Sequence, residues 1–254
     1  MLAFLRHALR AVFTLSLFAC LSLARSLGAP EDAAPLPVLT IFQNLKTGKP
    51  QTVVTYGTSL TAAAEWPNAL HRYFDQLYPG QVTFVNAAQS GQHSNWGLAN
   101  LEARVLSQKP DLVFLEFAVN DAATKHGISA EKCRANLDTI VAALRAQNPR
   151  IDIVLQTMNP AWDSPVSAPK RYAGDRPELA AYYAVYRDYA RAHHLPLVDH
   201  YPVWATILQS EPDRFHTLVP DGIHPDAPAS LAVTWPAIQS LLDAARAPAV
   251  SIAE

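Results

Sequence analysis

Cysteine is scarce in this chain of 254 residues, which contains only Cys20 and Cys133. Cys20 lies in an N-terminal segment that we expect to be removed, which leaves Cys133 alone. One cysteine cannot form an intramolecular disulfide, so the chain is not a disulfide-stabilised domain. With 50% hydrophobic residues it has enough apolar material for one core of ordinary size, and packing must hold the fold together.

The apolar run near the N-terminus is short. It covers positions 11–23, which is 13 residues, whereas a helix that spans a bilayer takes about 20. Arg6 and Arg10 precede it, and Ser22-Leu23-Ala24 has the small-x-small form of a cleavage site. This pattern is typical of a signal peptide over residues 1–24, so we expect export, to the periplasm or outside the cell, rather than a retained membrane anchor.

Cys20 leaves a second form of export open. The segment Leu17-Phe18-Ala19-Cys20 loosely resembles a bacterial lipoprotein box, although Phe18 is bulky where small residues are usual. A lipid anchor at Cys20 is therefore the alternative to a mature chain that begins near Arg25.

Neither sign of charge is in large excess. The chain has 20 basic and 22 acidic residues, a net charge of −2. Residues 1–24 contain two of the basic residues and no acidic residue, so their removal changes the net charge to −4. We therefore expect neither nucleic acid nor an anionic membrane surface as a partner.

The rest of the sequence predicts one catalytic domain. Residues 25–40 hold Pro30, Pro35 and Pro37 among small and acidic residues, which favours an extended linker. A domain is expected over 41–248, followed by a short tail at 249–254. No long repeat and no second domain is visible in the pattern.

Apolar, strand-like runs alternate with helical patterns throughout this domain. Strands are expected at 52–56, 82–86, 111–117, 151–157 and 195–199. Helices are expected from position 66, over 97–106, 130–147 and 177–193, and within 227–245. Several strand runs are apolar at almost every position, as in a sheet covered on both faces. The prediction is an α/β fold, a three-layer α/β/α sandwich around a central parallel sheet.

Polar residues follow the predicted strands where ligand sites of such sheets form, beyond the carboxyl ends. Ser59 follows the first strand, Gly91 the second and Asn120 the third, while Asp221 and His224 lie in the turn-forming segment 221-DGIHPD-226. We expect all five at one rim.

Three of these residues fit nucleophilic catalysis. A serine hydroxyl needs a base to take its proton, and the base needs an orienting partner. In a tight turn Asp221 can hold Nδ1 of His224 while Nε2 faces Ser59. Each residue taken singly has a structural alternative, because Ser59 can cap a helix and Asp221 can cap the last helix.

An oxyanion formed in such a reaction needs hydrogen-bond donors. Gly91 can supply a backbone N–H, Asn120 a side-chain amide, and Ser59 its own backbone N–H. The alternatives are that Gly91 serves a turn and that Asn120 and Asp121 cap a helix. We interpret Asp121 as structural.

These blocks, in this order, resemble those of the SGNH hydrolases, also called the GDSL esterase/lipase family. The matching blocks are Ser59, 86-NAAQSGQHS-94 with Gly91, Asn120-Asp121 and 221-DGIHP-225. The segments 65-EWPNAL-70 and 97-GLANL-101 are similar to the bacterial thioesterase/lysophospholipase branch. The resemblance runs from about Thr52 to about Ile238 and implies a flavodoxin-like fold and serine ester hydrolysis with no cofactor and no metal.

The chain departs from the pattern of that family at two positions. Gly-Asp-Ser becomes Gly57-Thr58-Ser59, which removes a carboxylate beside the nucleophile. The glycine that begins the Gly-x-Asn-Asp block becomes Ala118, and we expect the added methyl group to narrow the acyl pocket.

Other functions are weighed against ester hydrolysis. The segment 46-KTGKP-50 lacks the first glycine of a phosphate-binding loop. A metal site can recruit carboxylates and histidines, but no HExxH pattern supports it; its candidates are Asp199, His200, Asp221, His224 and Asp226. A catalytically dead homologue that only binds carbohydrate, and an acyltransferase, stay open.

Aromatic and polar residues mix in the predicted rim loops. Trp96, Trp162 and Tyr172 are expected to bind substrate, since a sugar ring can lie on an indole or phenol. The alternative is that the two tryptophans are packing anchors. We predict an esterase that removes acetyl or similarly short acyl groups from a small-molecule or polysaccharide ester, with a lysophospholipase or thioesterase as the second candidate.

Overall fold

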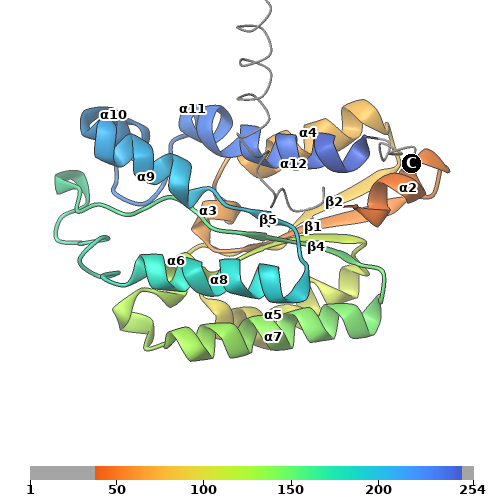
Figure 1. Ribbon diagram of the computed structural model, residues 1–254, viewed down its shortest axis with the longest axis horizontal. Helices are drawn as coiled ribbons and strands as arrows, with labels where there is room; N and C mark the ends of the chain where they lie inside the picture. Colours follow the sequence, from red (N-terminus) through yellow and green to blue (C-terminus); the bar gives the residue numbers. More distant parts are fainter. Residues whose placement is uncertain (1–37, 248–254) are drawn as a thin grey trace, which may run out of the picture. The chain divides into compact units, whose positions relative to one another are not determined.

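The computed structural model describes residues 38–247, and Figure 1 shows their arrangement. The predicted signal peptide, the alternative lipid anchor at Cys20, most of the predicted linker and the predicted tail lie outside the described residues. None of the helices in the described range combines the length and apolarity that crossing a membrane requires.

Five parallel strands form one sheet in the order β2-β1-β3-β4-β5. They are β1 (Gln51–Gly57), β2 (Val82–Asn86), β3 (Leu112–Glu116), β4 (Asp152–Gln156) and β5 (Leu197–Val198). Strands β3 and β4 are buried at every position, because helices cover both faces of the sheet. The predicted parallel sheet is confirmed, with strand ends within two residues of the expected ones.

The helices form a layer on each face of the sheet (Figure 1). One layer contains α2 (Thr40–Lys46), α4 (Trp66–Leu77) and α12 (Trp235–Arg246), and the other α5 (Ser94–Arg104), α7 (Ala130–Gln147) and α8 (Leu179–His193). Successive strand residues point to opposite faces, so Val53 joins the core beneath the first layer and Val54 the core beneath the second. The three-layer α/β/α sandwich is thus confirmed.

Short elements join these layers. They are α3 (Ser59–Ala62), η1 (Leu106–Gln108), α6 (Ala118–Asp121), η2 (Thr124–His126), η3 (Pro165–Ser167), α9 (Tyr201–Ser210), α10 (Pro212–Leu218), α11 (Ala227–Ala229) and the π-helical turn η4 (Ser230–Thr234). The domain also begins slightly before the predicted boundary. Leu39 is buried, and the Asp152 carboxylate accepts the N–H groups of Thr40 and Ile41 at 3.0 and 2.8 Å.

Helices α9 and α10 were not predicted and form a small apolar cluster of their own. The rings of Trp204 and Phe215 meet edge to face with centroids 5.9 Å apart. Val219 and Ala229 complete the cluster from either side of the segment that carries Asp221 and His224. The cluster therefore anchors both ends of that segment.

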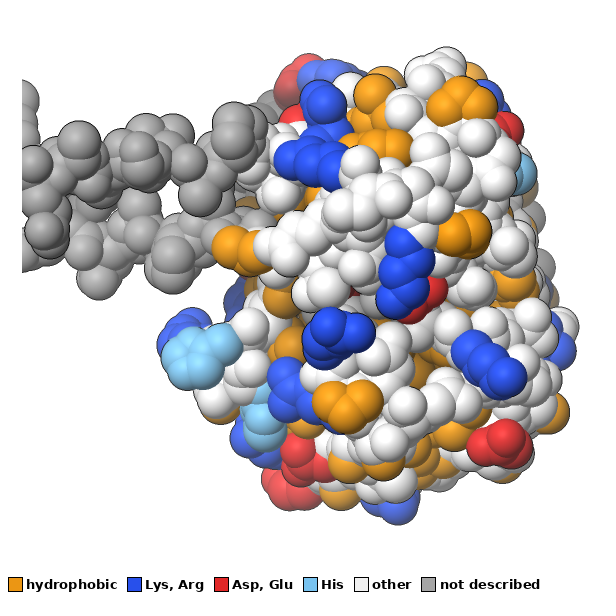
Figure 2. Space-filling model, turned by 90° about the vertical axis from the view of Figure 1, so that its right-hand side faces the viewer, with side chains coloured by type: hydrophobic (Ala, Val, Ile, Leu, Met, Phe, Trp, Pro, Cys, Tyr) orange, Lys and Arg blue, Asp and Glu red, His pale blue; other side chains and the backbone are white. Residues whose placement is uncertain are grey.

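Charged side chains are spread over the face seen from the right-hand side of Figure 1. In Figure 2, lysine and arginine side chains lie in separate places on this face, among uncharged and acidic ones. This face therefore carries charges of both signs.

Candidate active site

Ser59 is the first residue of α3 and lies two residues after the end of β1. Thr58, and not Ser59, is the N-cap of α3, because its Oγ1 accepts the N–H of Leu60 at 3.1 Å. The capping interpretation of Ser59 is therefore wrong, since its neighbour has that role. The Ser59 side chain is partly exposed beyond the carboxyl end of β1 and has its hydroxyl available for another partner.

That partner is His224. Its Nε2 lies 2.7 Å from Ser59 Oγ, and its Nδ1 lies 2.6 Å from Asp221 Oδ2. A carboxylate can only accept, so Nδ1 carries the proton and Nε2 accepts the serine hydroxyl. The three residues singled out by the sequence form one continuous chain of hydrogen bonds.

The turn itself holds the Asp221 carboxylate. Asp221 Oδ1 accepts the N–H groups of Ile223 and His224 at 3.0 and 2.8 Å. Burial alone would raise the pKa of Asp221, but the hydrogen bonds from the His224 side chain and from the two backbone groups outweigh it and lower the pKa below its ordinary value. Asp221 therefore stays ionised and can hold the imidazole in one orientation.

A loop after β4 anchors this turn. Ser164 Oγ donates to Pro220 O at 2.6 Å, and Ser167 Oγ donates to Asp221 O at 2.7 Å. Gly222 has a φ of +102°, and a side chain there would clash with the Trp162 carbonyl. No motif around Ser164 indicates from sequence alone that this segment supports the Asp-His turn.

The predicted oxyanion donors lie on the segments that follow β1, β2 and β3. Gln89 N–H donates to Gly57 O at 3.0 Å, which keeps the segment leading to Gly91 beside the end of β1. Asn120 Nδ2 donates to Gln92 O at 2.8 Å. Within residues 38–247, the N–H groups of Ser59 and Gly91 have no protein acceptor. Such groups remain able to donate to a substrate.

Glu116 is a polar residue of this region that the sequence interpretation missed. Its Oε1 accepts the Thr58 N–H at 2.6 Å, Thr58 Oγ1 at 2.9 Å and Thr61 Oγ1 at 2.7 Å. A side chain on Gly57 would clash with this carboxylate. Thr58 stands where the family pattern has an aspartate beside the nucleophile. In this chain Glu116, at the end of β3, supplies a carboxylate in the same region, and the Thr58 hydroxyl donates to it.

Burial raises the pKa of Glu116 to about 7, although hydrogen bonds from Thr61 and Thr58 partly oppose the effect. Between the ordinary carboxyl value of about 4.5 and about 7, the folded protein holds a proton that the unfolded chain releases. The free energy of unfolding contributed by Glu116 therefore falls as pH rises through this window.

We expect Glu116→Gln to remove this contribution, because glutamine keeps the size of the side chain and takes up no proton. Melting temperatures measured from pH 4.5 to 8 should decline less with rising pH in the variant than in the wild type. Other buried groups titrate similarly in both proteins and cancel in the comparison. Glu102→Gln, which changes an exposed glutamate on α5, is the control. Parallel curves for wild type and Glu116→Gln would contradict the assignment.

Two of the three predicted substrate-binding aromatics are engaged in packing. The Trp96 ring packs against Tyr56, with centroids 5.9 Å apart, and against the Arg104 guanidinium at 5.2 Å. Trp162 stacks on His216 at 3.8 Å and donates its indole N–H to Val219 O at 2.6 Å. These contacts favour the packing-anchor interpretation for both tryptophans.

Tyr172 is the third aromatic, and its ring faces that of His224 edge-on, with centroids 6.3 Å apart. Its side chain is partly exposed beside the Ser59–His224–Asp221 chain. Of the three aromatics, Tyr172 is thus the one whose ring faces the catalytic histidine candidate, and substrate binding by Trp96, Trp162 and Tyr172 stays a prediction.

Ala118 and Asp121 have structural surroundings. Ala118 is 1% exposed within the core, so its methyl group does not line an open pocket and the expectation of a narrowed acyl pocket is wrong. Asp121 Oδ1 accepts the N–H of Ser94 at 2.8 Å, at the first residue of α5. Asp121 thus joins the segment after β3 to α5, as expected of a structural residue.

Candidates for a metal site are engaged in other contacts. Asp199 forms an ion pair with Arg187 at 2.7 Å, and His200 Nε2 lies 3.1 Å from Gln156 Oε1. In the described part of the chain, no three histidine, cysteine or acidic side chains are placed to hold one metal ion.

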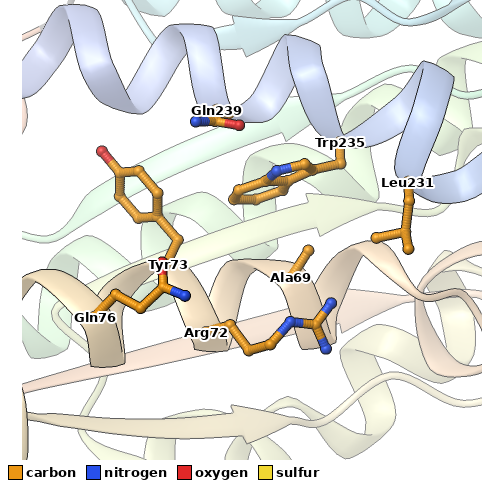
Figure 3. Close-up of a pocket in the computed structure, with 7 residues that line it drawn as sticks. All are labelled: Ala69, Arg72, Tyr73, Gln76, Leu231, Trp235 and Gln239. Atoms are coloured by element: carbon orange, nitrogen blue, oxygen red, sulfur yellow. The ribbon is translucent and has the colours of Figure 1, made fainter.

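A pocket of about 240 Å³ lies between α4 and α12 (Figure 3). Its lining residues are Ala69, Arg72, Tyr73, Gln76, Leu231, Trp235 and Gln239. The Tyr73 hydroxyl donates to Asp243 at 2.8 Å, and its ring meets Trp235 with centroids 5.9 Å apart. These side chains join the two helices, and none of them belongs to the predicted site.

Comparisons with known proteins identify the family of the chain. The model of the GDSL-like Lipase/Acylhydrolase family matches residues 54–229. Esterase TesA of Pseudomonas aeruginosa is 28% identical over 202 residues, which cover 76% of this chain and 90% of TesA. The Thioesterase 1/protease 1/lysophospholipase L1 of Escherichia coli K12 is 27% identical over 173 residues, or 68% of this chain and 72% of that protein.

Solved structures share the fold. A catalytic mutant of Axe2, an acetylxylan esterase from Geobacillus stearothermophilus, has a TM-score of 0.61 at 17% identity, covering 76% of this chain and 94% of that one. A lipase/acylhydrolase from Enterococcus faecalis has a TM-score of 0.59 at 23% identity, covering 76% and 96%. With the family model matched over most of the domain, the chain belongs to the GDSL-like lipase/acylhydrolase family and is an ester hydrolase.

Proposed function

We propose that the chain hydrolyses esters through Ser59, His224 and Asp221, as nucleophile, general base and orienting carboxylate. The observation that carries this proposal is the hydrogen-bonded chain from Asp221 Oδ2 to His224 and on to Ser59 Oγ, with distances of 2.6 and 2.7 Å. Distances of this size allow a proton to pass from the hydroxyl to Nε2 without rearrangement.

The first half of the proposed reaction forms an acyl-enzyme. His224 Nε2 takes the hydroxyl proton as Ser59 Oγ bonds to the ester carbonyl carbon, and the carbonyl oxygen becomes an oxyanion. The N–H groups of Ser59 and Gly91 and the Asn120 amide donate to it. The bond to the alcohol oxygen then breaks, and protonated His224 gives its proton to the leaving alcohol.

The second half releases the acid. His224 takes a proton from a water molecule, whose oxygen attacks the acyl carbon and forms a second oxyanion at the same donors. When the bond to Ser59 Oγ breaks, His224 returns the proton to the serine. Asp221 stabilises the imidazolium formed in each half without being protonated.

We further propose a short acyl group, most simply acetyl, on a carbohydrate as the substrate. Among the described residues, large exposed apolar side chains are few, namely Val38, Leu77, Val166, Val203 and Leu231. Only Val166 lies in the loops expected at the rim. These loops present partly or fully exposed polar groups such as Gln89, Gln92 and Lys170, and place Tyr172 beside His224. Such a surface suits a polar sugar better than a long acyl chain.

A series of p-nitrophenyl esters tests this substrate. We expect kcat/KM to be highest for acetate or butyrate and to decline at longer acyl chains, and acetate to be released from acetylated xylan. The Ser59→Ala variant is the control for both assays. A rate that peaks at acyl chains of about eight carbons or more, without release of acetate from xylan, would contradict the substrate and leave the serine mechanism standing.

The second candidate is a lysophospholipase or thioesterase. The observation that favours it is the name of the Escherichia coli relative, which is 27% identical to this chain. A lysophospholipid and a long-chain acyl thioester, assayed beside the ester series, separate the two candidates.

We also propose that the protein is exported, because the N-terminal sequence has the pattern of a signal peptide.

A further inference from the structure

Arg176 is a buried cation at the edge of the candidate active site. Arg176 is only 7% exposed, and burial lowers the pKa of its guanidinium group. In the described part of the chain it forms no ion pair with a carboxylate. A buried charge without a counterion is costly, and a protein tolerates it where the charge serves another purpose.

The contacts of Arg176 point to that purpose. Its Nε donates to Val119 O at 2.7 Å, its Nη2 to Asn120 Oδ1 at 3.0 Å and its Nη1 to Tyr172 O at 3.2 Å. The guanidinium also lies over the Tyr172 ring, 5.5 Å from its centroid. Arg176 thus binds both the backbone before Asn120 and the side chain of Asn120.

These contacts allow the Asn120 side-chain amide only one orientation. Arginine can only donate, so the atom that faces Nη2 must be the amide oxygen. The Gln92 carbonyl can only accept, so the atom that faces it, at 2.8 Å, must be the amide nitrogen. One of the two amide hydrogens is then used, and the other is left to donate to a substrate oxyanion.

We propose that Arg176 is a positioning residue that orients and polarises the Asn120 amide for the oxyanion. A cation on the amide oxygen draws electron density away from the nitrogen and makes its N–H groups stronger donors. The hydrogen bond from the Asn120 amide becomes stronger as negative charge develops on the substrate oxygen. Arg176 therefore stabilises the transition state more than the bound substrate. The inference rests on the proposed serine mechanism and is independent of the carbohydrate substrate.

Arg176→Met and Arg176→Lys test this role with p-nitrophenyl acetate. Methionine removes the charge and the donors, and we expect kcat to fall by about 10–100-fold with KM nearly unchanged, as for other residues that act through a neighbouring group. Lysine keeps the charge but not the forked geometry, so its loss of kcat should be smaller. Arg187 lies on α8, and Arg187→Met, which removes its ion pair with Asp199, is the control, with lower stability and unchanged kcat.

The decisive measurement combines the substitutions with Asn120→Ala. Without the amide, Arg176 has nothing to orient, so Arg176→Met and Arg176→Lys should each lower kcat by less than about threefold in that background. An equal loss of kcat in both backgrounds, or an effect on KM alone, would overturn the proposal. If Arg176→Met does not fold, the lysine variant in the two backgrounds decides. Retained activity in Ser59→Ala would instead overturn the serine mechanism itself.

Discussion

Replacing Ser59 or His224 with alanine is expected to lower kcat by about 10⁴–10⁶-fold, and replacing both should cost little more. The hydroxyl is a weak nucleophile without the imidazole, and the imidazole has nothing to activate without the hydroxyl. Each single substitution therefore already removes the rate enhancement that the pair supplies together. Initial rates with p-nitrophenyl acetate, measured on variants with native circular dichroism, give the three values. Losses that multiply in the double variant would contradict a shared mechanism.

Asp221→Asn completes this test. The base survives without its carboxylate but loses its orienting partner, so we expect a smaller loss of kcat, about 10²–10⁴-fold. Asp226→Asn is a matched control in the same segment, because Asp226 Oδ1 accepts the N–H of Ala229 at 2.8 Å and caps α11. Asparagine is also a good cap, so the control should keep kcat within about twofold.

Asn120→Ala is expected to lower kcat by about 10²–10³-fold with little change in KM, because the amide donates to a charge that exists only in the transition state. Steady-state kinetics over a range of p-nitrophenyl acetate concentrations separate the two constants. A change confined to KM would mean that Asn120 binds the substrate in its ground state.

A second substitution at this position separates the lost donor from lost packing. Asn120→Asp keeps the side-chain size and the oxygen that faces Arg176 Nη2, but it has no N–H group to donate. We expect it to fold and to lose at least as much kcat as the alanine variant, since its negative charge opposes the oxyanion. Wild-type kcat in the aspartate variant would exclude Asn120 as an oxyanion donor.

The fold was predictable because its signal is local. Strands such as β3 are apolar at nearly every position, and α7 carries one apolar stripe, so periodicity alone locates them. Helices α9 and α10 escaped prediction because they are short and their apolar side chains pack chiefly on each other and the neighbouring turn. Their pattern depends on partners that the sequence does not reveal.

The residues of the candidate site also fall into two groups, those with a local sequence signal and those whose roles depend on distant contacts. Ser59, Asn120 and His224 were found because turn-forming sequence blocks carry them. Glu116 and Arg176 were missed because their roles depend on contacts made only after folding, across 58 and 56 residues respectively. For Trp96 the sequence leaves packing and substrate binding equally open, because an aromatic residue near the rim has the same pattern in both roles.

The separation of 165 residues between Ser59 and His224 also has a consequence for biosynthesis. A chain made from its N-terminus exposes the serine turn long before the histidine emerges, and at that stage the serine has no base. Two further long-range contacts, Trp66 N–H to Ser230 Oγ at 3.0 Å and the Tyr73 hydroxyl to Asp243 at 2.8 Å, join α4 to the segment that follows the histidine. Under the proposed serine mechanism, we therefore expect the unfinished polypeptide to lack esterase activity until the segment that carries His224 docks onto the first part of the domain.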